Sequence, residues 1–316
     1  MSGNSETALI TGGNGNIGRL VADQLLARGQ RVIKFDIPGT EPTETQAGEE
    51  IVSGDIRDTD LLKEIIHDHK PDTIYHLASL LSGSSEVNIV DTWAINATAS
   101  FHLMNLALNA GVGTFLFSST AASYGPVDED PMPLDYAQWP ESMYGATKVA
   151  VERMGVYFKC KHGLDFRCSR LPLVISPYAP ETAVSAYPSI AFKAASQGKA
   201  FSFPVAPDTG VSSLFLDDII DSVVALADAD RGALTQHVYN LHGYFMTAQE
   251  VADTVKQHFP DFEYRFEPVE NVDRLISQWP NIIDDSDARR DWNWNPAYDF
   301  AGSAQRMCEL LKSGQL

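Results

Sequence analysis

Short apolar runs alternate with amphipathic stretches along the first half of the chain. The runs are short enough to be strands, and they cover residues 7–11, 31–37, 51–56, 72–77, 114–117 and 165–171. Between them, apolar residues recur at intervals of three and four, as on the buried face of a helix. Strands that alternate with helices predict a parallel sheet with helices on both faces. The expected fold class is therefore α/β, a doubly wound parallel sheet of the Rossmann type.

The pattern after residue 171 is less regular and predicts a smaller α/β substrate lobe at the C-terminal end. Helices are expected at 187–197, 247–258 and 301–312, strands at 238–241 and 262–266, and a loop at 198–210. Residues 214–227 predict a strand that runs into a helix. We expect the parallel sheet to form one domain over 1–171, with returning segments near 211–241 and 287–316. The substrate lobe is expected over 172–210 and 242–286.

A glycine-rich turn separates the first predicted strand from the first predicted helix. Gly12, Gly15 and Gly18 form a G-x-x-G-x-x-G pattern between them. In such a turn the first glycine permits the bend, the second lets a pyrophosphate approach, and the third lets helix and strand pack closely. The helix N-terminus then faces the phosphates. A glycine-rich loop without function is the alternative interpretation, and the strand–turn–helix context speaks against it.

Asp36 ends the second predicted strand, 18 residues after Gly18. An acid at this place can accept hydrogen bonds from the adenosine ribose hydroxyls, and it repels a 2′-phosphate. The next residues are Ile37, Pro38 and Gly39, so no basic side chain follows directly. The sequence therefore predicts that the domain over 1–171 is a dinucleotide-binding domain, and it favours NAD over NADP.

Tyr144 and Lys148 are four residues apart in a predicted helix, so both lie on one face. A neighbouring ammonium favours the phenolate and makes the tyrosine a plausible proton-transfer group. A surface Tyr/Lys pair without function is the alternative. Thr120, after the fifth predicted strand, is placed at the edge of the sheet where ligands bind in this fold class.

Composition and charge limit the classes of binding partner and the cellular location that we expect. The formal net charge is −19, which argues against nucleic acid and anionic membranes. No apolar run approaches the ~20 residues that span a bilayer, and residues 1–6 do not resemble a secretory signal. The three cysteines have no metal-site spacing, so we expect free thiols, no metal and a cytoplasmic, reducing location.

Four motifs together resemble the extended short-chain dehydrogenase/reductases, a superfamily with sugar-nucleotide epimerases, dehydratases and alcohol dehydrogenases. They are the glycine turn after Thr11, Asp55, the Ser118-Ser119-Thr120 run and Tyr144-x-x-x-Lys148. The similarity covers essentially the whole chain. The resemblance implies a catalytic set of Thr120, Tyr144 and Lys148. It implies an NAD site formed by Gly12, Gly15, Asn16, Ile17, Gly18, Asp36, Asp55, Ile56, Leu77, Ala78, Ser79, Asn96, Ser118, Tyr144, Lys148 and Leu171.

Two stretches, residues 72–82 and 278–294, are similar to the short-chain type of L-threonine 3-dehydrogenase. This likeness implies a substrate pocket formed by Ser82, Thr120, Thr182, Ser185 and Trp279. Ser82 as a loop hydroxyl, Thr120 as a strand end and Trp279 as a core residue are the structural alternatives. Residues 180–187 lack the Thr-Thr-Asp-Tyr run of that family, so another small hydroxy acid remains open as the substrate.

The resemblance implies NAD-dependent oxidation of a small hydroxy amino acid by a homodimer. The expected dimer contact involves the helices near 91–110 and 142–161, because the second is apolar on more than one side. A sugar-nucleotide 4-epimerase uses the same Tyr and Lys. It needs cations for a diphosphate, and these are scattered over 172–288. A non-enzymatic NAD(P)-sensing protein is the third possibility, although such proteins often lack the Tyr/Lys pair.

Overall fold

The computed structural model describes residues 5–40, 42, 44–180 and 183–313. Its main feature is a seven-stranded sheet with the strand order β10-β6-β5-β4-β1-β2-β3. The strands are β1 (Thr7–Thr11), β2 (Arg31–Asp36), β3 (Glu49–Ser53), β4 (Thr73–His76), β5 (Thr114–Thr120), β6 (Phe166–Leu171) and β10 (Tyr239–Asn240). The five strands from β3 to β5 pair in parallel. The predicted doubly wound α/β fold is confirmed.

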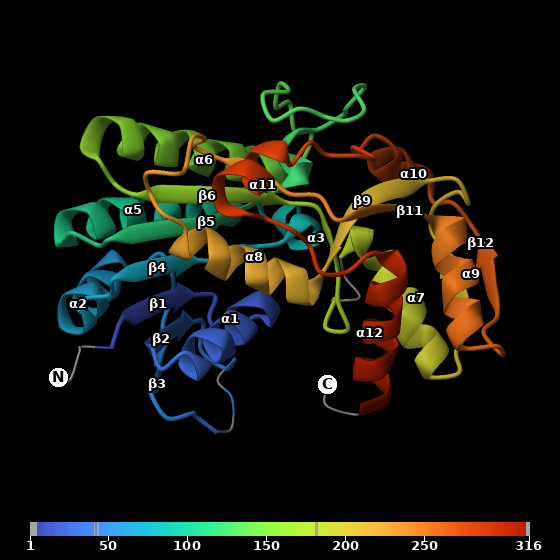
Figure 1. Cartoon of the computed structure of the whole chain (residues 1–316), viewed down its shortest axis with the longest axis horizontal. Helices are drawn as coiled ribbons and strands as arrows, with labels where there is room; N and C mark the ends of the chain where they lie inside the picture. Colours follow the sequence, from blue (N-terminus) through green and yellow to red (C-terminus); the bar gives the residue numbers. More distant parts are fainter. Residues whose placement is uncertain (1–4, 41, 43, 181–182, 314–316) are drawn as a thin grey trace. The chain divides into compact units, whose positions relative to one another are not determined.

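Helices cover both faces of this sheet (Figure 1). They are α1 (Asn16–Ala27), α2 (Thr59–His69), α5 (Ala99–Ala110), α6 (Met143–His162) and α8 (Leu216–Asp228). Alternate strand residues such as Leu9, Ile33 and Phe115 join one buried cluster with apolar side chains of α2, α5 and α6. On the other face α1 lies beside α8, where Arg28 pairs with Asp228 at 2.7 Å.

The chain divides into two compact units. The first contains residues 1–119, 142–169 and 220–239, and the second contains 120–141, 170–219 and 240–316. The boundaries between the units fall near the carboxyl ends of β5 and β6, directly before α6, within α8 and within β10. The domain boundaries drawn from the sequence stay a prediction.

The second unit has its own small sheets and core. Strands β7 (Leu173–Ile175), β9 (Gly210–Phe215) and β11 (Tyr244–Thr247) form one sheet, and β8 (Phe201–Phe203) pairs with β12 (Tyr264–Phe266). Its helices are α7 (Tyr187–Ser196), α9 (Ala248–His258), α10 (Glu270–Ser277), α11 (Ser286–Trp292) and α12 (Phe300–Ser313). Side chains of α7, α9 and α12 share one apolar cluster with the three-stranded sheet.

The expectation of a loop at 198–210 is wrong in part, because β8 lies within it. A three-residue strand has too few positions to show a period in sequence, and β8 exists only through its pairing with β12. The helical stretch before Gly111 is also more complex than predicted. It comprises α4 (Ile89–Thr92), a π-helical turn η1 (Trp93–Thr98) and α5.

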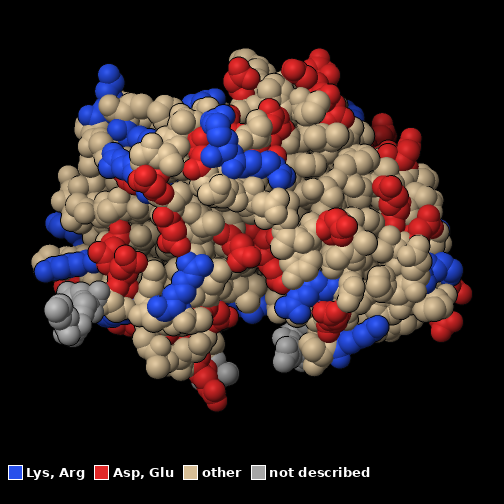
Figure 2. Space-filling view, in the orientation of Figure 1, with Lys and Arg blue, Asp and Glu red and all other residues tan. Residues whose placement is uncertain are grey.

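Many acidic side chains lie on the surface, as expected from the net charge of −19. Figure 2 shows acidic side chains spread over the face drawn, with basic side chains between them. Among the described residues, no helix has both the length and the apolar character needed to cross a membrane.

Candidate active site

The glycine turn after β1 leaves no room for side chains. Gly12 has a φ of +73°, and a Cβ on it would lie 2.8 Å from the nitrogen of Ala78. A Cβ on Gly18 would lie 2.1 Å from the carbonyl oxygen of Gly12. Helix α1 begins after Gly15 without a side-chain cap and without an acid in its first turn. The positive end of this helix is therefore electrostatically suited to a phosphate.

Asp36 ends β2, and Asp55 follows the neighbouring strand β3. The carboxylate of Asp36 accepts hydrogen bonds from the nitrogens of Asn14, at 2.9 Å, and Ile37, at 2.8 Å. These contacts hold the carboxylate beside the glycine turn. The nitrogen of Gly54 donates to the carbonyl of Asp36 at 2.9 Å, which brings Asp55 to the same edge of the sheet.

The loop after β4 is fastened to the same edge. The nitrogen of Leu77 donates to the carbonyl of Thr11 at 3.1 Å. Further along, the Asn96 side chain accepts from the nitrogen of Leu80 at 2.8 Å and donates to its carbonyl at 3.1 Å. Asn96 also donates to the hydroxyl of Thr147 at 3.3 Å. Its amide therefore fixes the loop against α6, and direct contact with a cofactor stays a prediction for this residue.

A fully buried histidine lies beneath this loop. His76 contacts the hydroxyls of Thr11 and Ser100, each at 2.7 Å. Because Ser100 donates its own proton to the carbonyl of Asn96, Nε2 of His76 donates to Ser100 and Nδ1 accepts from Thr11. Burial, with a smaller effect of the Lys148 charge, lowers the pKa of His76 to about 3. The imidazole is thus neutral and acts as a rigid connector.

Helix α6 carries the predicted Tyr/Lys pair. It begins after Ser142, whose hydroxyl accepts from the nitrogen of Gly145 at 3.1 Å. The ammonium nitrogen of Lys148 lies 5.4 Å from the ring centroid of Tyr144 and donates to the carbonyl of Ser118 at 2.9 Å. The predicted placement of tyrosine and lysine on one helix face is present.

The environment of Lys148 lowers the affinity of its amino group for a proton. Burial lowers the pKa of Lys148 to about 8, although the charges of Cys168 and Glu152 act in the opposite direction. The ammonium also lies 4.6 Å from the ring centroid of Phe117. At neutral pH the residue keeps its charge, and a positive charge close to a phenol favours the phenolate.

The residues of the first unit fit NAD. The glycine turn between β1 and α1, which we call the NAD cradle, has no space for a methyl group at Gly12 or Gly18. The start of α1, which has no side-chain cap, suits a pyrophosphate. The buried hydroxyl oxygen of Ser118, at the carboxyl end of β5, has no hydrogen-bond partner among the described residues. A ligand hydroxyl there would satisfy it.

The other predicted cofactor residues of this unit also follow strand ends. Asn16 is exposed and Ile17 half-buried in the first turn of α1, and Ser79 lies in the loop after β4. The side chain of Ile56 packs in the apolar core of the first unit. Ser82 begins the short helix α3 (Ser82–Ser85) and is half-buried.

Thr120, Leu171, Ser185 and Trp279, which the sequence assigned to catalysis, cofactor or substrate, belong to the second unit. Thr120 ends β5, and its hydroxyl accepts from the nitrogen of Ala122 at 3.2 Å. Leu171 is buried at the end of β6. Trp279 packs at the edge of the apolar cluster of this unit, and Ser185 lies half-buried in the turn η3 (Val184–Ala186). Thr182 lies outside the described residues.

The sequence interpretation also missed a buried contact of α6 within the first unit. Glu152 is fully buried and accepts a hydrogen bond from Ser119 at 2.5 Å. It stands four residues after Lys148, so helical spacing alone was a usable signal. Among residues 5–40, 42, 44–180 and 183–313, no group of three His, Cys, Asp or Glu side chains is placed to hold a metal ion.

Comparison with known proteins agrees with this geometry. Residues 8–241 match the model of the NAD dependent epimerase/dehydratase family. The mitochondrial L-threonine 3-dehydrogenase of Sus scrofa is 32% identical over 302 residues, which are 94% of this chain and 80% of that protein.

Two solved structures are also similar. One is the holo form of a GalE-like L-threonine dehydrogenase from Cupriavidus necator, with a TM-score of 0.90 and 28% identity over 96% of this chain and 99% of that one. The other is a monomeric L-threonine 3-dehydrogenase from a metagenome, with a TM-score of 0.89 and 28% identity over 97% and 99%. The predictions of an extended short-chain dehydrogenase and of NAD as cofactor are confirmed. The chain belongs to the NAD dependent epimerase/dehydratase family.

Proposed function

We propose that this enzyme oxidises the 3-hydroxyl of L-threonine, giving 2-amino-3-oxobutanoate. The observation that carries the proposal is Lys148, a buried ammonium fixed by the carbonyl of Ser118 beside the ring of Tyr144. This pair lies in the unit that holds the NAD cradle. The choice of L-threonine as the substrate is based on similar proteins that are described as L-threonine dehydrogenases.

The roles of the residues follow from their chemistry. Tyr144, as phenolate, takes the proton of the substrate hydroxyl, and the Lys148 charge keeps the phenolate accessible near neutral pH. Thr120 donates a hydrogen bond to the reacting oxygen. We assign Ser82, Ser185 and Trp279 to substrate binding, because the likeness to L-threonine 3-dehydrogenases implies these residues; Thr182, which the likeness also implies, lies outside the described residues. The bound NAD supplies the acceptor for the hydride that leaves the same carbon.

The NAD residues named from the sequence are part of the proposal. Gly12, Gly15 and Gly18 shape the pyrophosphate site, Asp36 binds the adenosine ribose, and Lys148 binds the nicotinamide ribose. We assign Asp55 to the adenine end, and the support is that it follows β3, the strand paired with the one that Asp36 ends.

A substrate panel tests the proposal. We expect NADH formation with L-threonine, and at most weaker formation with other small 3-hydroxy acids. Interconversion of a sugar nucleotide without net NADH release, together with no reaction of L-threonine, would replace the proposal with an epimerase.

We also propose a cytoplasmic homodimer. Its support is a set of large apolar side chains exposed on η1, α5 and α6, including Trp93 (47%), Phe101 (41%) and Tyr157 (54%). The three free cysteines fit a reducing compartment. Light scattering at micromolar protein concentration tests the oligomeric state. A mass of 34.6 kDa, which is the mass of one chain, would contradict the dimer.

A further inference from the structure

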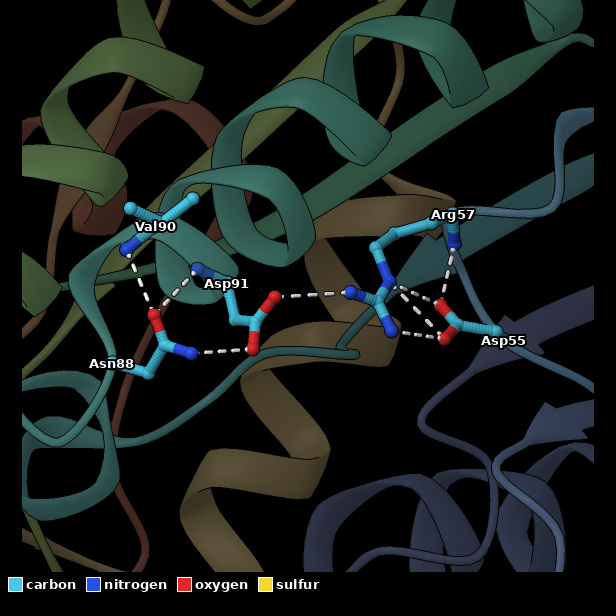
Figure 3. A network of polar contacts seen from close by, with 5 residues as sticks. All are labelled: Asp55, Arg57, Asn88, Val90 and Asp91. Atoms are coloured by element: carbon cyan, nitrogen blue, oxygen red, sulfur yellow. Dashed lines mark hydrogen bonds and ion pairs between the residues drawn. The ribbon is translucent and has the colours of Figure 1, made fainter.

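Arg57 holds the Asp55 carboxylate in one orientation (Figure 3). Its backbone nitrogen and its Nε each donate to Oδ1 of Asp55 at 2.9 Å, and Nη2 donates to Oδ2 at 2.5 Å. Both carboxylate oxygens are therefore occupied by one residue. The guanidinium also holds the pKa of the Asp55 carboxyl below its usual range. A fork of this kind fixes direction as well as charge.

The same guanidinium reaches a distant part of the chain. Nη1 of Arg57 donates to Oδ1 of Asp91 at 3.3 Å, and Asn88 donates to Oδ2 of Asp91 at 2.6 Å. Asn88 in turn caps α4, because its side chain accepts from the nitrogens of Val90 and Asp91. Arg57 thus links the turn after β3 to the start of α4, as Figure 3 shows.

Residues 80–92, which we call the bridging segment, also contact α6, the helix that carries Tyr144 and Lys148. Glu86 accepts a hydrogen bond from the nitrogen of Met143 at 2.7 Å. Met143 is the first residue of α6 and directly precedes Tyr144. The bridging segment therefore has polar contacts both with the Asp55 turn and with the start of the helix that carries the proton-transfer group.

Within one chain, apolar packing contributes little to holding residues 87–90 of the bridging segment in place. Val87 is 85% exposed, Val90 is 75% exposed and Ile89 is 56% exposed. Where side chains bury little surface, hydrogen bonds and ion pairs carry a larger share of local order. The Arg57–Asp91 contact is thus well placed to control this order.

We propose that Arg57 is a positioning residue for the adenine end of the NAD site, and that its bond to Asp91 couples NAD binding to the order of the bridging segment. The proposal rests on the proposed function in one respect, the placement of Asp55 at the adenine. A carboxylate that is already oriented loses less freedom when a ligand donor binds it. The bridging segment also contains Ser82, one of the residues assigned to substrate binding.

The test measures NAD affinity by calorimetry and amide exchange of residues 80–92 by mass spectrometry, on the full chain. Arg57→Gln should weaken NAD binding about tenfold, the order expected when a hydrogen bond to a charged group is lost. Asp91→Asn should weaken it about threefold, as for an exposed ion pair. Both variants should speed amide exchange in the bridging segment, and NAD should protect that segment less than in the native chain.

A matched pair provides the control. Arg28 and Asp228 are joined at 2.7 Å with side-chain exposures of 44% and 50%, close to the 45% and 50% of Arg57 and Asp91. Arg28→Gln and Asp228→Asn should leave both readouts at native values. Arg57→Lys keeps the charge without the fork, so it should restore only part of the affinity.

Three results would overturn the proposal. One is native NAD affinity in Arg57→Gln, and another is full recovery in Arg57→Lys, which would make charge alone sufficient. The third is unchanged exchange of residues 80–92 in Asp91→Asn. Failure of the substrate assignment is separate: native protein that binds NAD but does not oxidise L-threonine contradicts the proposed function, while the variants still decide the role of Arg57.

Discussion

Lys148 offers a test of the buried site that does not depend on a substrate. Burial lowers its pKa to about 8 in the folded chain, from the ordinary 10.5. Between these values the unfolded chain binds one more proton than the folded chain, so folding becomes more favourable as the pH rises. The contribution is complete above 10.5 and is lost as the pH falls through 8.

The magnitude follows from the same two values. A difference of one proton changes the free energy of unfolding by about 1.4 kcal/mol for each pH unit. At pH 8 the folded lysine is half protonated, so the gain from pH 8 to pH 10 is about 2 kcal/mol. Lys148 is 5% exposed, so solvent screening reduces this figure little.

Urea unfolding of the native chain and of Lys148→Met at pH 8 and pH 10 measures this gain. The native chain should become more stable relative to the variant by about 2 kcal/mol over this range. Groups distant from Lys148 titrate alike in both proteins and cancel in the difference, and making both proteins in a Tyr144→Phe background removes the phenol that responds to the Lys148 charge. Lys161→Met, at the exposed end of the same helix, should show no such trend. A difference between native chain and Lys148→Met that stays constant with pH would refute the account of the buried ammonium.

Three further substitutions test the assigned roles. Tyr144→Phe should lower kcat by about 10²- to 10⁴-fold with little change in NAD affinity, because it removes the proton acceptor and almost no packing; retention of a tenth of native activity would point to another base. Asp36→Ser should raise the NADP-to-NAD ratio of kcat/KM about tenfold or more, since facing like charges cost several kcal/mol; a native enzyme that prefers NADP contradicts the assignment. Trp279→Ala should raise the KM for substrate far more than that for NAD, and an equal rise in both would limit Trp279 to core packing.

Much of the first unit could be predicted because its signals are local. The turn from Gly12 to Gly18 joins a strand to a helix within one short stretch, and Asp36 ends the next strand. Tyr144 and Lys148 are related by helical spacing alone. Each of these features is defined by neighbours along the chain.

The remaining features depend on contacts between distant segments. Arg57 donates a hydrogen bond to Asp91, which is 34 positions away in the sequence. His76 of β4 is hydrogen-bonded both to Thr11 of β1 and to Ser100 of α5. No periodicity along the chain encodes such pairs. The second unit was harder to predict for the same reason, because β8 has only three residues and is a strand through its pairing with β12.

The fate of one hydrogen tests the central claim most directly. L-Threonine carrying deuterium at C3 is incubated with the enzyme and NAD, and the reduced cofactor is analysed by mass spectrometry. If Tyr144 takes the hydroxyl proton while the C3 hydrogen leaves as hydride, the cofactor gains the deuterium, and Tyr144→Phe yields almost no labelled cofactor. Reduced cofactor without the label, or none from L-threonine, would contradict the claim.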